Sequence, residues 1–387
     1  MLALQRQADR FDLVGIGWLV EQGAVGAAAF GFRTVLDKAP DTHESEISYT
    51  PMRQALTDGP LRQRHAVAMT YPRNQLVPPG SPGTYHCVSR CVRRAFLCGK
   101  DRYSGQSFEH RRQWIEDRLH QLADVFAVSL WAYAVMSNHL HVVVQVLPEV
   151  AAQWTDEEVA ERWIRLFPKA EQDSELRVQA LIANPEQLAV LRSRLSDLSW
   201  FMRCLSEPIA RRANAEDHCK GRFWEGRFKC QALLDESAVL AAMAYVDLNP
   251  VRAALCETLE DSAHTSARKR LEQHDAEAVT GEVIAPVAGV GGQCVLGITA
   301  TDYLQLLDWT GRLVHPNKRG TLNGPPPRAL RRLGHDAAQW PRQVLAVGSE
   351  FHRAVGAAEA LIAKAAAMGQ RWLHGISAAR RLLHADH

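Results

Sequence analysis

Several features that would place this chain in a familiar class are missing from its sequence. None of its eight cysteines forms a Cys-x-x-Cys pair, so a zinc ribbon is not expected. The apolar stretch from Leu13 to Phe32 is interrupted by Glu21 and is too polar to span a bilayer or to act as a convincing secretory signal. We therefore expect reduced thiols in a cytoplasmic protein that has no membrane partner.

The chain also lacks a strong net charge, but its charge is unevenly spread. The formal net charge is +2, yet residues 301–387 contain 12 Lys and Arg against 6 Asp and Glu. A second basic region comprises Arg90, Arg93, Arg94, Lys100, Arg102, Arg111 and Arg112. Local basic faces are what bind a polyanion, although a solvated surface is the simpler explanation for any single arginine.

Alternating hydrophobicity and turn residues predict an α+β fold. Two strands are expected to form a hairpin about Ser137-Asn138, and residues 150–215 have a helical pattern interrupted by proline. The predicted strands are Thr84–Arg90, Phe126–Val135 and His139–Val146, and the predicted helices begin after Ser107 and at Asp235 or Ser237, the latter ending at Pro250.

The composition divides the chain into four expected parts. Residues 1–68 have weak periodicity and are expected to be a poorly structured extension or a wrongly assigned start, since Met69 offers a second one. A main domain over residues 69–265 follows, with a helical insertion at about 150–215. Residues 266–295 are expected to be a linker, and residues 296–387 a basic, mostly helical C-terminal region.

The most informative segment is His139-Leu-His141, at the start of an apolar run. Residues i and i+2 of a strand share a face, so both imidazoles would project together. Sixteen histidines in this chain would give roughly 0.7 His-x-His pairs by chance, so the spacing alone does not distinguish a metal site from two ordinary histidines.

A second segment, Met243 to Arg252, supplies groups that could complete a site. On a helix, Tyr245 and Asn249 are neighbours on one face. A metal ion could be held by His139, His141 and the carbonyl oxygen of Asn249, next to the tyrosyl hydroxyl. A helix cap before Pro250 is an equally good explanation of Asn249.

Basic and aromatic residues alternate between Gly221 and Lys229, a pattern that suits a strand or ribbon lying against nucleic acid. Aromatic residues here could stack bases while arginines follow a backbone. An edge strand with its aromatics in the core fits the pattern comparably well. The residues expected to contact DNA are Arg90, Arg93, Arg94, Lys100, Arg222, Trp224 and Arg227, and Phe223 and Phe228 are further candidates for stacking.

In this order the motifs resemble those of the single-tyrosine HUH transposases, in particular the REP-associated tyrosine transposases of the IS-two-hundred-like superfamily. The resemblance rests on His139-Leu-His141, on Tyr245 four residues before Asn-Pro-Val, and on the segments Tyr85–Arg90 and Gly221–Arg227. It covers roughly residues 78–260. The helical insertion and the region from 296 onward depart from the compact members.

The resemblance implies a ferredoxin- or RRM-like antiparallel sheet with flanking helices, the HUH fold, to which the insertion and the C-terminal region are added. It also implies cleavage and rejoining of single-stranded or hairpin DNA in transposition, with Tyr245 forming a 5′-phosphotyrosine link and freeing a 3′-OH. A free tyrosine, with a pKa of about 10, is roughly one part in a thousand phenolate at neutral pH, and a divalent metal would offset this. Imidazoles alone favour zinc, copper or nickel, but amide and phosphate oxygens favour Mg²⁺ or Mn²⁺, as does the resemblance.

Two other functions stay open at this point. The chain could be a domesticated descendant that binds hairpin DNA or RNA as a regulator without cleavage. A replication initiator or relaxase of the same chemical class is disfavoured, because the tyrosine usually comes first in relaxases. Either a monomer or a homodimer is compatible with the sequence.

Overall fold

The computed structural model describes residues 73–92, 97–101, 105–169, 173–276, 283–291, 296–315 and 325–383, and the predicted extension over residues 1–68 lies outside them. Six strands form one sheet in the order β5-β2-β3-β1-β4-β6. Neighbouring strands are antiparallel except for β4 and β6. The strands are β1 (Gly83–Arg90), β2 (Val128–Val135), β3 (His139–Val146), β4 (Lys229–Leu233), β5 (Ala288–Gly289) and β6 (Ala354–Val355). This mixed arrangement confirms the predicted α+β class.

The centre of the sheet is the predicted hairpin together with β1. Strand β3 begins and ends at the predicted residues, and its partner β2 is buried along its whole length. Because β3 lies between β2 and β1, both its edges are hydrogen-bonded and its side chains are held in a fixed register. The His-x-His segment therefore starts a rigid inner strand.

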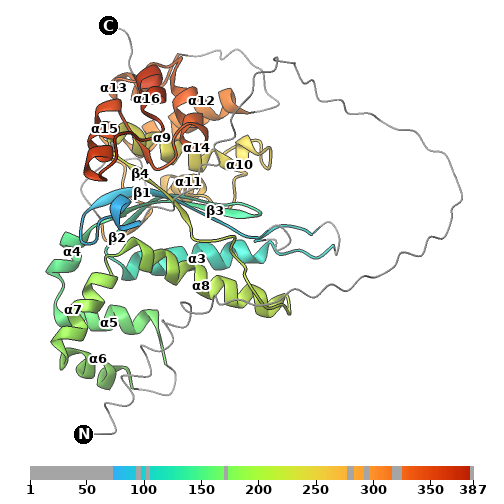
Figure 1. Ribbon diagram of the computed structural model, residues 1–387. Coiled ribbons are helices and arrows are strands. Elements are labelled where there is room, and N and C mark those ends of the chain that lie inside the picture. Colours follow the sequence, from blue (N-terminus) through green and yellow to red (C-terminus); the bar gives the residue numbers. More distant parts are fainter. Residues whose placement is uncertain are drawn as a thin grey trace, which may run out of the picture. The chain divides into compact units, whose positions relative to one another are not determined.

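One face of the sheet is covered by α3, on which α8 packs, and the helical insertion continues from this layer (Figure 1). Side chains cap most of these helices: Thr155, Asp173, Asn184 and Asp197 each accept a hydrogen bond from a backbone N–H of the first turn. The helices are α3 (His110–Val125), α4 (Pro148–Gln153), α5 (Asp156–Leu166), α6 (Ser174–Ile182), α7 (Pro185–Arg194) and α8 (Leu198–Glu216). We call this side the insertion face.

The opposite face is covered by α9 (Glu236–Asp247), which begins at its cap Asp235 as predicted. From Ala238 to Val246 every residue of α9 is apolar and buried except Tyr245, which is typical of a helix enclosed by its neighbours. The C-terminal helices lie on α9, so α9 is sandwiched between them and the sheet (Figure 1). We call this side the tyrosine face. The other helices are α2 (Arg73–Leu76), α10 (Asn249–Arg252), α11 (Ser266–Ala276), α12 (Ala300–Val314), α13 (Arg328–Arg332), α14 (Trp340–Ser349), α15 (Ala358–Ala367) and α16 (Ile376–Leu383).

The segment expected to be a linker, residues 266–295, contains helix α11 and strand β5 in its described part. Helix α11 is anchored at its start by the buried carboxylate of Asp247, which accepts hydrogen bonds from the Ser266 hydroxyl and the Ala267 N–H. Strand β5 then pairs with β2, and only glycine fits at residue 289, where φ is +116° and a Cβ would overlap the Val128 carbonyl oxygen. The linker prediction is wrong here, because a two-residue strand leaves no periodic pattern.

The C-terminal region also belongs to the same sheet. Its strand β6 extends the sheet beyond β4, and the Asp235 carboxylate that caps α9 accepts a second hydrogen bond from the Ala357 N–H at 2.7 Å. The described part of residues 296–387 contains helices α12 to α16, and this region is packed on the strands and on α9. In the part of the chain that the structure describes, no helix has both the length and the apolar composition needed to cross a membrane.

Candidate active site

Three imidazoles lie together on the tyrosine face of the sheet. His139 and His141 project to the same side of β3, with ring centroids 4.8 Å apart. His86 of the neighbouring strand β1 is stacked on His141 at 5.1 Å, and its Nε2 lies 2.9 Å from Nδ1 of His141. The pairing of β1 with β3 thus adds a third histidine to the pair that the sequence spacing predicts.

All three imidazoles are neutral near neutral pH. Burial lowers the pKa of His86 to about 4, although its hydrogen bond with Gln231 acts in the opposite direction. Burial, with the charges of Arg90 and Arg252, lowers the pKa of His139 to about 4, and burial with neighbouring positive charge holds the pKa of His141 well below its usual value. A neutral imidazole has a lone pair that can bind a metal ion.

Tyr245, in the last turn of α9, meets this cluster from above the sheet. Its ring centroid lies 5.9 Å from that of His86 and 5.8 Å from that of His141, both in edge-on contacts. On another side the tyrosine packs against α14, where a Cβ at Gly348 would overlap the Tyr245 hydroxyl. The structure therefore brings the predicted tyrosine and the predicted histidine pair into one site, with helix α14 directly beside the hydroxyl.

Arg252, at the end of α10, supplies a positive charge to the same site. Its guanidinium carbon lies 4.1 Å from the centroid of the Tyr245 ring, and its charge contributes to the lowered pKa of both His139 and His141. The Nη1 atom of Arg252 is buried and has no hydrogen-bond partner. A buried donor on a cation that is not satisfied by the protein is suited to bind an anionic ligand.

Asn249 is buried at the start of α10, and helix α9 ends two residues earlier. Within the described residues, no hydrogen bond joins its side chain to the histidines, and no group of three or more His, Cys, Asp and Glu side chains is placed to hold a metal ion. The predicted metal ligands that the structure brings together are the imidazoles of His139 and His141. A metal ion bound there would take its remaining ligands from the oxygen atoms of water or of a bound substrate.

The predicted DNA-binding arginines that the structure describes lie near the His139 end of the site. Arg90 ends β1 opposite His139 and forms an ion pair with Glu225 at 3.7 Å. Arg222 and Arg227 are exposed in the loop that follows α8, and Lys100 is exposed in a separate short bridge to Ser107. Arg93 and Arg94 lie outside the described residues.

The aromatic residues of this loop, which were expected to stack on bases, make contacts within the protein. Phe223 is buried in the core and cannot reach a base, so that expectation is wrong. Trp224 is half-buried and donates its indole N–H to the Ser206 carbonyl of α8 at 2.9 Å. Phe228 lies under the guanidinium of Arg73 at 3.6 Å. The alternation of this segment thus reflects core packing on one side and exposed arginines on the other.

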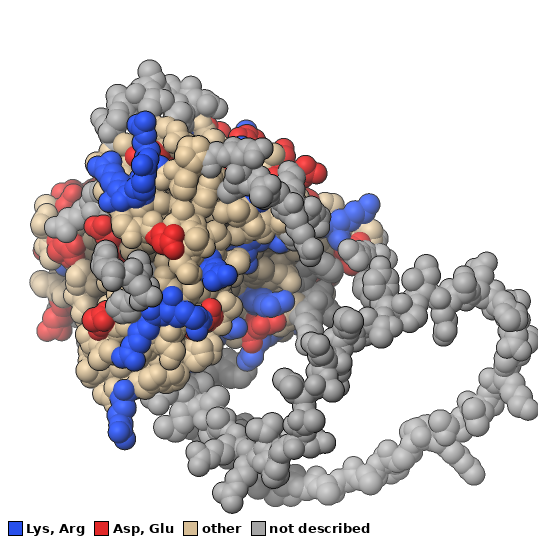
Figure 2. Space-filling view, turned by 90° about the horizontal axis from the view of Figure 1, so that it is seen from above, with Lys and Arg blue, Asp and Glu red and all other residues tan. Residues whose placement is uncertain are grey.

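Seen from the side of the C-terminal helices, Lys and Arg form separate groups with Asp and Glu between them (Figure 2). A ligand that follows a continuous basic stripe is not indicated by this view.

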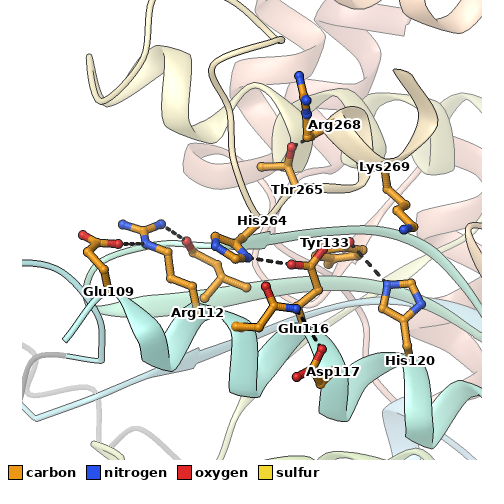
Figure 3. A network of polar contacts seen from close by, with 12 residues as sticks. Glu109, Arg112, Glu116, Asp117, His120, Tyr133, His264, Thr265, Arg268 and Lys269 are labelled. Atoms are coloured by element: carbon orange, nitrogen blue, oxygen red, sulfur yellow. Dashed lines mark hydrogen bonds and ion pairs between the residues drawn. The ribbon is translucent and has the colours of Figure 1, made fainter. Parts of the chain in front are cut away.

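The insertion face carries a polar network of its own (Figure 3). The carboxylate of Glu116 on α3 accepts hydrogen bonds from the Tyr133 hydroxyl at 2.5 Å and from His264 at 2.6 Å. Arg112 pairs with Glu109 at 2.6 Å and also donates to the Val135 carbonyl. These hydrogen bonds tie α3 to β2 and to the residues just before α11.

Neither a protein-family model nor a curated protein sequence matches the chain. Among solved structures, a REP-associated tyrosine transposase bound to a REP hairpin is similar over 54% of this chain and 91% of that one, with 13% sequence identity and a TM-score of 0.30. That similarity is too low to transfer a fold or a function to this chain.

Besides His86, the structure adds three residues to the site that the sequence analysis did not place there. Arg252 was visible as a cation seven residues after Tyr245, which is two helical turns. Gln231 and Gly348 carry no such signal, because their contacts with the site depend on strand pairing and on the packing of α14.

Proposed function

We propose that this chain cleaves and rejoins single-stranded or hairpin DNA, with Tyr245 as the nucleophile, as the transposase-type chemistry of the HUH fold requires. The observation that supports this most directly is the packing of Tyr245 against the neutral pair of His86 and His141, with the unpartnered guanidinium of Arg252 on its ring. Nucleophile, anion-binding group and metal-binding imidazoles then belong to one site of one chain. A monomer is therefore sufficient for one cleavage step.

In the proposed step the Tyr245 oxygen attacks the phosphorus of a phosphodiester. The new Tyr–O–P bond forms as the bond from phosphorus to the 3′ oxygen breaks, and the phenolic proton is balanced by the proton that the leaving 3′ oxygen gains. The products are a 5′-phosphotyrosine and a free 3′-OH, so a later 3′-OH can reverse the reaction on another strand without a nucleotide cofactor.

Arg252 is proposed to bind the scissile phosphate. Negative charge spreads over the phosphate oxygens in the transition state, and a guanidinium already fixed in place needs no reorganisation to stabilise it. Its neighbours do not compete for it, because the histidines are neutral and its Nη1 has no partner. A guanidinium binds phosphates and carboxylates alike, and only the proposed reaction selects a phosphate here. The experiment therefore uses DNA.

His139 and His141 are proposed to hold a divalent cation, Mg²⁺ or Mn²⁺. Such an ion would withdraw charge from the phosphate and stabilise the leaving oxygen. With two imidazoles and no carboxylate among the described neighbours, the site supports Mn²⁺ at least as well as Mg²⁺, which usually binds through carboxylates and water. Asn249 stays a candidate third ligand only as a proposal.

The test is incubation of the full chain with hairpin-flanked single-stranded DNA, labelled on the 3′ side of the cleavage site, and Mn²⁺. A covalent protein–DNA band is expected for the wild type and none for Tyr245→Phe, which keeps the ring but removes the attacking oxygen. The His139→Ala/His141→Ala variant should bind DNA and fail to cleave it. Adduct formation by Tyr245→Phe, or none by the wild type, would reject the proposal.

One observation favours the alternative of a DNA- or RNA-binding regulator that does not cut. The Tyr245 hydroxyl lies against Gly348, so α14 covers one side of the attacking atom. Under this alternative, wild type and the His139→Ala/His141→Ala variant would bind the hairpin equally and neither would form an adduct.

A further inference from the structure

A row of three side chains crosses the sheet and ends at the proposed metal site. Gln231 of β4 lies opposite His86 of β1 in the strand register, and its Oε1 is 2.8 Å from the His86 Nδ1. His86 is in turn 2.9 Å from Nδ1 of His141 on β3. The three side chains share the tyrosine face and form one continuous chain of hydrogen bonds.

The far end of this row is fixed by the C-terminal region. The Gln231 Nε2 donates to two backbone carbonyls, that of Val347 at 3.0 Å and that of Phe351 at 2.6 Å. Carbonyl oxygens only accept, so the amide must present its NH₂ group to them and its oxygen to His86. Val347 lies in the last turn of α14, where a carbonyl has no partner within the helix and needs one from outside.

This orientation determines where each proton in the row lies. Because Gln231 offers an oxygen, His86 must donate from Nδ1, and a neutral His86 then has a lone pair on Nε2. That lone pair accepts a hydrogen from Nδ1 of His141, which leaves Nε2 of His141 without a proton. Nδ1 of His139 lies 2.6 Å from the Asn138 Oδ1, an acceptor, so Nδ1 carries the proton and Nε2 of a neutral His139 has none.

His86 itself is not available as a ligand, because both of its ring nitrogens are engaged in the row. Its place is behind His141, at the ring nitrogen that would face away from a bound ion. Hydrogen bonds of this kind orient a ligating imidazole and fix its tautomer, and losing one typically lowers metal affinity by about 10- to 100-fold.

We propose that Gln231 and His86 are positioning residues for a divalent cation, and that the docking of α14 fixes His141 in the tautomer whose Nε2 can bind that cation. This proposal rests on the proposed function only in taking His139 and His141 as the metal ligands. It makes the C-terminal region a component of the metal site, although none of its residues touches the ion.

The experiment compares the full chain with Gln231→Leu, and with Gln343→Leu as a matched control. Gln343, on α14, makes the same pair of bonds elsewhere: its Nε2 donates to the Leu382 carbonyl at 2.6 Å and its Oε1 lies 3.0 Å from the His335 Nδ1. Both variants lose a glutamine that joins a histidine to the backbone, although Gln231 is half-buried and Gln343 is buried. Only one of these histidines is connected to His141.

Two readouts that need no DNA are measured on each protein. Nitrogen NMR of ¹⁵N-histidine-labelled protein without metal reports the His141 tautomer, with its signals assigned from the loss of peaks in His141→Ala. Titration calorimetry with Mn²⁺ reports the affinity. We expect Gln231→Leu to give a mixed His141 tautomer and an affinity for Mn²⁺ about 10- to 100-fold weaker, and Gln343→Leu to match the wild type in both.

An unchanged tautomer and affinity in Gln231→Leu would overturn the proposal, as would an equal loss in Gln343→Leu or a wild type that binds no Mn²⁺. Melting curves of all variants show whether each is folded under the conditions used. His86→Phe, which keeps a ring but has no nitrogen, should reproduce the Gln231→Leu result even if that variant melts early. If the protein passes these tests but forms no DNA adduct, the positioning role of Gln231 and His86 is supported and only the proposed cleavage is rejected.

Discussion

Two arginines on opposite faces of the sheet have similar aromatic neighbours but different hydrogen-bond partners. Arg111 on the insertion face and Arg252 on the tyrosine face each lie 4.1 Å from the centroid of an aromatic ring, that of Phe108 and that of Tyr245. Arg111 is fully buried and bonded to Glu216 and Asp217 at the end of α8. Arg252 has a buried nitrogen with no partner. A neutralised cation fastens two helices together, whereas an unpartnered one retains the capacity to bind an anion.

The largest effect is expected when Arg252 is replaced by Gln. Loss of a preorganised charge from the phosphate should lower the rate of adduct formation by about 100- to 1000-fold. The melting temperature should change little, because no protein group accepts a hydrogen bond from the Nη1 atom of Arg252. Single-turnover cleavage of labelled DNA together with thermal melting measures both, and a stability loss as large as the rate loss would contradict the comparison.

Arg111→Gln should give the opposite result. Glu216 and Asp217 would lose their partner, and breaking such a buried pair costs about 3–5 kcal/mol, towards the lower end here because both carboxylates are partly exposed. Urea unfolding measures this free energy. The rate of adduct formation per folded molecule should equal that of the wild type, and a specific loss of cleavage would place the insertion face in the mechanism.

Gly348→Ala tests the contact between the C-terminal region and the tyrosine. The new methyl group would overlap the Tyr245 hydroxyl and ring, so we expect a loss of about 1–3 kcal/mol in the free energy of unfolding. The same change in a Tyr245→Ala background should cost much less, because the overlap is gone. Gly311→Ala on α12 is the control, since its methyl group would meet only a flexible carbon of Leu248 at 3.1 Å.

The smallest effect is expected from Glu116→Gln in the network of the insertion face. Burial alone would raise the pKa of Glu116, but hydrogen bonds from His264 and Tyr133 outweigh it and lower that pKa. A carboxylate with a lowered pKa stabilises the fold above its unfolded pKa of about 4.3, and this stabilisation is lost as the pH falls. The variant should therefore be about 1–2 kcal/mol less stable at pH 7, this difference should shrink as the pH falls below about 4.3, and cleavage at pH 7 should be unchanged.

Local patterns were sufficient to predict part of this arrangement. The limits of β3, the shared face of His139 and His141, and the cap at Asp235 follow from alternation and from residue chemistry within a few positions. Because each depends on neighbours in the chain, the sequence contains the information directly. The α+β class follows for the same reason.

Other features depend on residues that are distant in sequence. Strands β5 and β6 are two residues long and exist only through their partners, and Gln231 meets the backbone of Phe351 across 120 positions. The absence of a partner for Arg252, or the burial of Phe223, is a property of the finished packing. No pattern of spacing distinguishes the arginine that is neutralised from the one that is not.

The hydrogen bond from Gln231 to the Phe351 carbonyl also has a consequence for the order in which the chain folds. A ribosome releases Tyr245 and both histidines more than 90 residues before Gly348 and Phe351 follow, and the sheet cannot gain β6 until then. Pairings between such distant residues are slow to form and come late in folding. A growing chain would therefore contain the proposed nucleophile Tyr245 for some time before the contacts that position its neighbour His141 can form.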